Sequence, residues 1–148
     1  MADQQNYANH ARWFPLFHFV VLPLLLLHFL AHVVRLIMAE PGSGRITMAS
    51  LSFLSLLVLL AALAARNMAL RVQDRVIRLE ERLRYKELLP AEVAAKASDL
   101  PVGEIIALRF ASDAELPGLV EKVLNGELKG NKPIKQAVQT WRADHLRA

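Results

Sequence analysis

The chain contains no cysteine among its 148 residues. This absence excludes disulfide bonds, thiol nucleophiles, thiolate zinc sites and cysteine-ligated iron–sulfur clusters. Charge is also scarce, since 22% of the residues are charged, whereas 54% are hydrophobic and the mean hydropathy is +0.27. Soluble domains seldom combine such values, so the apolar excess must be concentrated in particular segments.

Two segments lack Asp, Glu, Lys and Arg altogether: residues 13–34, a run of 22, and residues 46–65, a run of 20. A helix of roughly 20 apolar residues crosses the ~30 Å hydrocarbon core of a bilayer. The sequence therefore predicts two membrane-spanning helices, over residues 13–38 and 46–65. The first is expected to stay in the mature protein, because no small-x-small cleavage site precedes Arg35.

Proline and glycine shape this region. Pro15 suits a first helical turn, and Pro23 is expected to kink the first span. Residues 39–45 are rich in turn formers and too short to hold a domain, so the spans should be antiparallel neighbours. Near the span ends, seven Arg residues lie on the side of the termini against two on the side of the turn. This bias predicts that both termini are cytoplasmic and that residues 1–12 form a cytoplasmic arm.

No proline or glycine interrupts residues 66–89, so the second span should continue as one long helix up to Pro90. Apolar residues within it recur at steps of three and four, which is typical of a coiled-coil seam. We call these residues the seam: Ala69, Val72, Val76, Leu79 and Leu83. The seam predicts self-association or docking of a protein partner.

Arginines recur along another face of the same helix, at positions 71, 75, 78 and 82. One interpretation is a solvated charged face. A second is contact with anionic lipid headgroups, for which Arg66, Arg71 and Arg75 are the candidates. Nucleic acid ranks last, because residues 66–148 carry 15 basic against 12 acidic residues and no nucleic-acid-binding motif.

The remaining sequence predicts short helices. Residues 91–100 are interpreted as a linker or frayed helix, and residues 101–148 as a small helical unit that begins with a helix over residues 102–110. Ser112 and Glu115 have the spacing of a capping box, which would open the next helix.

That helix should stop at Asn125-Gly126, because Gly suits the position just after a helix end. A last helix should start at Pro133 and direct Trp141 into the core. The predicted fold class is therefore all-α: a transmembrane hairpin, a long cytoplasmic helix and a small C-terminal helical unit.

Four groups of residues together indicate a family: Asn9-His10-Ala11-Arg12 with Pro15 and His18, Gln73-Asp74-Arg75 with Ile77-Arg78, the block 106–113, and the ending from Ile134-Lys135 through Trp141-Arg142-Ala143-Asp144-His145. Through these residues the chain resembles a family of short bacterial two-span membrane proteins of unknown function. The resemblance implies a bacterial inner membrane, with the turn over residues 39–45 in the periplasm, and brings no activity or ligand.

His28, His32 and Arg35 share one face of the first span. Two histidines at this spacing can coordinate a metal ion, but a complete site would need ligands from another copy of the chain. An oligomeric cofactor-binding or transport-linked protein is thus the alternative function. We favour a structural role, in which His28 bonds a serine hydroxyl or a carbonyl and fixes the register of the hairpin.

Residues for catalysis are missing from the sequence. Asp144 and His145 are adjacent and point apart on a helix, and neither a nucleophile motif nor a phosphate loop accompanies them. We therefore expect no enzyme and no cofactor. The favoured function is a small membrane scaffold or interaction protein that acts through its cytoplasmic helices.

Overall fold

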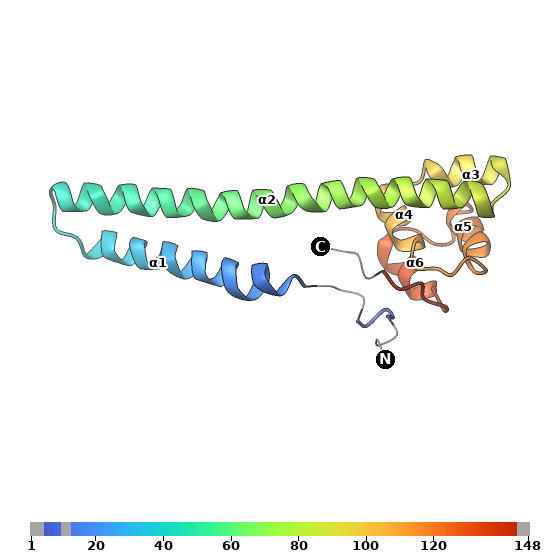
Figure 1. Ribbon diagram of the computed structural model, residues 1–148, viewed down its shortest axis with the longest axis horizontal. Coiled ribbons are helices and arrows are strands. Elements are labelled where there is room, and N and C mark those ends of the chain that lie inside the picture. Colours follow the sequence, from blue (N-terminus) through green and yellow to red (C-terminus); the bar gives the residue numbers. More distant parts are fainter. Residues whose placement is uncertain (1–4, 10–12, 145–148) are drawn as a thin grey trace. The chain divides into compact units, whose positions relative to one another are not determined.

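The computed structural model describes residues 5–9 and 13–144, and within them the regular structure is helical (Figure 1). The chain divides into two compact units, one over residues 13–70 and one that begins at Arg71 and includes the described N-terminal residues. Of the arm expected over residues 1–12, only residues 5–9 are described. They form a turn in which Asn6 Oδ1 accepts a hydrogen bond from the Ala8 amide at 2.8 Å.

The first predicted span is a helix in two parts, a π-helical segment Leu16–Val21 (η1) and the α-helix Leu22–Met38 (α1). In η1 the Leu22 amide donates to the Phe17 carbonyl, five residues back. Pro23 follows directly. A proline ring clashes with the carbonyl four residues earlier, and a wider turn relieves that clash. The disturbance expected at Pro23 therefore takes the form of a π-helical turn on its N-terminal side.

The turn between the spans is shorter than predicted. Helix α2, Ser43–Leu88, begins inside the segment 39–45, so that Ser43, Gly44 and Arg45 are helical. Gly42 has a φ of +142°, a conformation that favours glycine, and its carbonyl accepts the amide of Arg45 at 3.1 Å. A glycine is thus what lets the chain reverse within four residues.

Helix α2 confirms that the second span continues without a break into the following segment, since it comprises 46 residues and ends two residues before Pro90. Its first part lies antiparallel to α1 as a hairpin (Figure 1). Two helices, Leu16–Met38 and Ser43–Leu88, are long and apolar enough to cross a membrane. Large apolar side chains along both face outward, among them Leu24, Leu27 and Phe53.

The second unit packs the end of α2 with short helices around one core. They are α3 (Ala91–Ser98), α4 (Val102–Leu108), α5 (Leu116–Leu124) and α6 (Asn131–Ala137). Tyr85, Leu108, Leu116, Val120 and Ile134 are fully buried at its centre. The small helical unit predicted for residues 101–148 is therefore larger, because it includes α3 and the end of α2.

Of the two alternatives for residues 91–100, the helix is confirmed and the linker was wrong, since Ala91–Ser98 is the helix α3. Pro90 and Pro101, with ψ angles of 144° and 140°, are the N-cap residues of α3 and α4. Ala94 and Ala97 of α3 are buried in the core. Small residues let this helix approach its neighbours closely, so an alanine-rich segment that resembles a linker is a packed helix.

The predicted capping box was also wrong. Helix α5 has Glu115 as its N-cap residue and no side-chain cap. The Glu115 carboxylate instead accepts the amides of Gln139 and Thr140, at 2.8 and 3.1 Å. The Ser112 carbonyl accepts the amides of Glu115 and Leu116. The Glu115 side chain therefore binds a distant segment of the chain and is not used in a capping box.

The observed limits of α5 agree with the prediction at its end, and those of α6 differ from it. Helix α5 stops at Leu124, and Gly126 has a φ of +79°, which confirms the predicted end. Helix α6 starts at Asn131, two residues before Pro133, and ends before Trp141. Trp141 lies beyond the helix and forms an isolated bridge with Ala111. Its ring packs on the core, 4.8 Å from the ring of Phe110.

Candidate functional site

The C-terminal part of α2 has two opposite faces. One face is buried in the second unit through Ile77, Glu81, Arg84 and Tyr85. The other face carries the predicted seam, and its large residues are between 49% and 61% exposed: Val72, Val76, Leu79 and Leu83. Ala69 is exposed as well. The exposed strip is the candidate site. The packing of the opposite face determines that this strip points away from the short helices.

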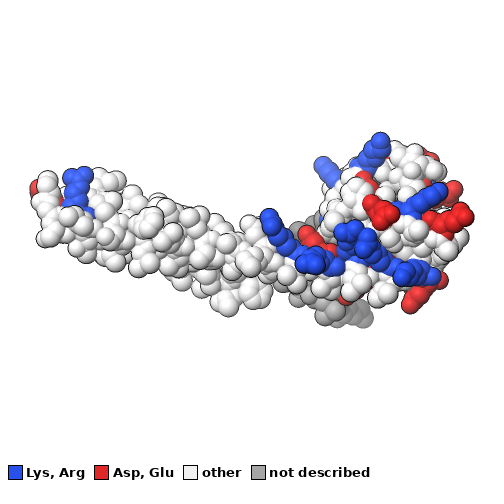
Figure 2. All heavy atoms as spheres, turned by 90° about the horizontal axis from the view of Figure 1, so that it is seen from above, with Lys and Arg blue, Asp and Glu red and all other residues white. Residues whose placement is uncertain are grey.

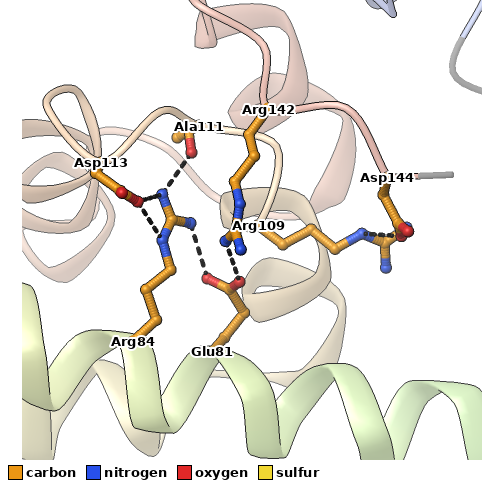
Figure 3. A network of polar contacts seen from close by, with 7 residues as sticks. All are labelled: Glu81, Arg84, Arg109, Ala111, Asp113, Arg142 and Asp144. Carbon is orange, nitrogen blue, oxygen red and sulfur yellow. Dashed lines mark hydrogen bonds and ion pairs between the residues drawn. The ribbon is translucent and has the colours of Figure 1, made fainter. Parts of the chain in front are cut away.

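A buried arginine holds α2 against the rest of the unit (Figure 3). Arg84 donates from Nε to Asp113 at 2.8 Å, and from Nη2 to the Ala111 carbonyl at 2.7 Å. Its Nη1 lies 3.2 Å from Glu81 Oε2, one helical turn earlier. A guanidinium donates along fixed directions, so these contacts set the rotation of α2 about its axis.

Two more arginines surround Glu81. Arg142 Nη1 lies 3.6 Å from Glu81 Oε1, and Arg109 Nε lies 3.2 Å from Asp144 Oδ2 (Figure 3). The guanidinium of Arg109 also stacks 4.5 Å from the ring centre of Phe110. A cavity of about 320 Å³ opens between Glu80, Glu81, Arg84, Arg109, Arg142, Ala143 and Asp144. Apart from Glu80, its charged groups pair with other charged residues, which suits a structural ion cluster.

Burial alters the acid–base behaviour of this face. Glu81 is 3% exposed, and its desolvation raises the pKa of its carboxyl group above the ordinary value, against the opposing effect of Arg84. Burial, together with the charge of Glu81, raises the pKa of the Tyr85 hydroxyl. That hydroxyl has no hydrogen-bond partner among the described residues. In both groups burial shifts the acid–base equilibrium toward the neutral form, which is expected of polar groups held inside a small core.

The arginines proposed for lipid contact are not among the residues that line the ion cluster. Arg71 and Arg75 are exposed, and Arg66 is half-buried. Figure 2 shows Lys and Arg gathered over the second unit, while the hairpin carries charge only at one end in that view. Arg82, the last member of the arginine face, donates to the Ser98 carbonyl at 2.9 Å and so ties α3 to α2. The arginine face is therefore part solvated surface and part structural.

The histidines of the first span lie together but not as predicted. Their rings are 4.5 Å apart, yet His28 is exposed and His32 is the buried one, and the Nδ1 of His32 lacks a hydrogen-bond partner among the described residues. The buried serines Ser52 and Ser55 donate to carbonyls of their own helix. The described part of the chain holds no group of three metal-ligating side chains. The register role predicted for His28, through a bond to a serine hydroxyl or a carbonyl, stays a prediction.

The sequence analysis missed the ion cluster. Its members come from α2, from the C-cap of α4 and from the segment after α6, so no local motif unites them. One signal was present: Ile77, Glu81 and Arg84 are spaced by four and three and share a helix face. A carboxylate and a guanidinium on the same face as a buried isoleucine indicate a packed ion pair.

The described residues thus define an all-α protein with two helices long and apolar enough to cross a membrane, followed by short C-terminal helices. The chain belongs to the family of unknown function DUF6526, which it matches along residues 1–148. This match supplies a family; the membrane location and the bacterial source stay predictions. No curated protein and no solved structure matches the chain.

Proposed function

We propose that the protein is a membrane-anchored interaction protein without catalytic activity, whose seam on α2 binds another helix. The observation that carries the proposal is the exposure of four large apolar residues on one face of α2, while the opposite face is fixed by Arg84 and Glu81. Apolar strips of this kind are typical of protein-binding surfaces. The anchored helix would present the strip close to the membrane surface.

The anchor is the hairpin of α1 and the first part of α2. Exposure of its outward-facing leucines and phenylalanines to water would be unfavourable, by about 25 cal/mol per Å² of apolar surface. Transfer of these side chains into lipid would remove that unfavourable free energy. The excess of arginine on the side of the termini supports a cytoplasmic location for the seam, at a bacterial inner membrane.

Arginines close to the second span support the same placement. Arg66 and Arg71 follow Ala65 within six residues, about 9 Å along a helix of 1.5 Å rise. Anionic headgroups attract basic residues at that distance by about 1 kcal/mol each. Arg75 lies about 15 Å beyond Ala65 on the same basis, nearly twice the ~8 Å Debye length, whereas Arg71 lies at about one Debye length. Arg66 and Arg71 are therefore the lipid contacts we propose, and Arg75 is available for another role.

The test is a pair of substitutions followed by crosslinking in native membranes. Val76→Asp places a charge in the exposed seam, whereas Val102→Asp places the same charge at the exposed N-terminal end of α4. We expect Val76→Asp to abolish the crosslinked species of higher mass and Val102→Asp to leave them intact. Identical crosslinks in both variants would contradict a function of the seam.

The histidine pair supports a second candidate function, in which an oligomer binds a cofactor or transported ligand at His28 and His32. The unpartnered Nδ1 of buried His32, next to exposed His28, is the observation that favours it. Gently extracted protein would then contain a metal, haem or quinone that His28→Ala lacks, with α-helical content unchanged. Protein that carries none of these groups would eliminate this candidate.

A further inference from the structure

The pattern of charges beside the seam indicates which partner the seam binds. We propose that the seam binds a second copy of the same chain, with the two α2 helices parallel and in register. This inference rests on the proposed function, because it names the partner of the same strip. Three features support it: the charges that flank the seam, the position of the second unit and the anchor shared by both copies.

The first feature is charge complementarity. In a two-stranded parallel coiled coil, the residue just before one core position faces the residue five places further along the partner helix. Val76 is a core position, so Arg75 would face Glu80 of the second copy, and symmetry would form this pair twice. Both residues are exposed, and neither has an ion-pair partner within the part of the chain that the structure describes.

The opposite orientation is disfavoured by the same residues. In an antiparallel pair, flanking positions of the same type face each other, so that Arg75 and Arg82 would meet arginines of the partner. Like charges at such positions repel. The two sequences that flank the seam therefore select the parallel arrangement.

The second feature is room for the partner. The ion cluster of Arg84 and Glu81 holds the short helices against the face of α2 that lies opposite Val76 and Leu79. Two seams can therefore meet without either copy having to move its own core. If α3 to α6 packed over the seam, Val72 and Leu83 would be covered, whereas both are more than half exposed.

The third feature is the anchor. Val at one core position and Leu at the next favour two parallel strands, but the seam covers only about two heptads, about 21 Å of helix. So short a coiled coil is weak by itself. Two copies held in one membrane by the same hairpin would meet at raised effective concentration and with the same direction. The hairpin would thus supply both the orientation and the missing affinity.

The first experiment uses the absence of cysteine. In membranes, Leu79→Cys places a single thiol at a core position, and Asn67→Cys places one on an exposed position of the same helix outside the seam. Mild oxidation should link Leu79→Cys into a disulfide dimer and leave Asn67→Cys monomeric. Equal dimer formation by the two variants, or none by Leu79→Cys, overturns the proposal.

The second experiment tests the register by exchanging charges in the Leu79→Cys background. Arg75→Glu and Glu80→Arg should each lower the disulfide dimer about fivefold, because both symmetric pairs change from attraction to repulsion. The double variant should restore it, and the two single variants mixed in one membrane should prefer each other. Additive losses in the double variant would overturn the parallel register.

The outcomes also separate this inference from the proposed function. If Val76→Asp removes crosslinks to other proteins while Leu79→Cys forms no dimer, the seam binds a different partner and the present inference is wrong. If neither the crosslinks nor the dimer depend on the seam, both proposals are wrong.

Discussion

Arg84 directs two nitrogens at one oxygen of Asp113: Nε lies 2.8 Å and Nη2 2.6 Å from Oδ1. The two residues belong to α2 and to the turn before α5, and Arg84 is 8% exposed. The contact therefore fastens the long helix to the short ones through a buried guanidinium and a carboxylate that is 66% exposed. It decides which face of α2 is buried and, as a result, which face is left for a partner.

Replacing Arg84 should weaken the second unit strongly. Arg84→Met leaves the buried Glu81 carboxylate without its nearest cation, and breaking such a pair costs about 3 kcal/mol of the free energy of unfolding. Lys122→Met removes an exposed cation of α5 and should change it by less than about 0.5 kcal/mol. Urea unfolding of the full chain in mild detergent, followed by Trp141 fluorescence in a Trp13→Phe background, measures both. Equal effects would contradict the role given to Arg84.

Glu81 should make stability depend on pH. Burial raises the pKa of its carboxyl group in the folded chain above the ordinary 4.5, so the folded state binds the proton more tightly than the unfolded state. Its stabilising contribution is complete below pH 4.5 and is lost as the pH rises through the folded-state pKa. We therefore expect the free energy of unfolding of the wild type, relative to Glu81→Gln, to fall with rising pH over this window. A difference that grew with pH would mean that the pKa is lowered by the arginines.

Tyr85→Phe should be tolerated. The Tyr85 hydroxyl is buried without a hydrogen-bond partner among the described residues, so the free energy of its burial is unfavourable. Removing it should leave the free energy of unfolding unchanged or raise it by up to about 1 kcal/mol. The substitution should also remove the loss of stability that tyrosine ionisation causes above pH 10. A loss of more than about 1 kcal/mol at pH 7 would show that the hydroxyl makes a stabilising contact.

Alanine substitutions of Glu115 and Ser112 should differ in their effect on stability. Glu115→Ala removes the acceptor of the Gln139 and Thr140 amides and should lower the free energy of unfolding by about 1–3 kcal/mol. Ser112→Ala should have almost no effect, because the serine side chain makes no cap and its carbonyl is retained. A capping box would instead make the two losses similar. Urea unfolding of the two variants distinguishes these cases.

The sequence predicted those elements that depend on composition alone. The charge-free runs identified both long apolar helices, and the absence of proline and glycine in residues 66–89 predicted the continuous helix α2. The seam was predicted from spacing, and the structure leaves all its members exposed. Whether it binds a helix stays a prediction.

Contacts between distant segments account for what sequence reasoning could not predict. Arg84 is one of several arginines on α2, and only the position of Asp113, 29 residues later, distinguishes it from the exposed Arg71. Glu115 had the correct spacing for a cap, but the segment after α6 binds it instead. Local patterns specify local structure, and such patterns do not reveal partners that the fold brings from elsewhere.

Extraction of native membranes with alkaline carbonate tests most directly the claim on which the account depends, that lipid surrounds α1 and the first part of α2. The account predicts that the chain stays in the membrane pellet and is released only by detergent. Recovery of the chain in the carbonate supernatant would contradict it, and with it the anchor, the lipid contacts of Arg66 and Arg71, and the parallel pairing of the seam.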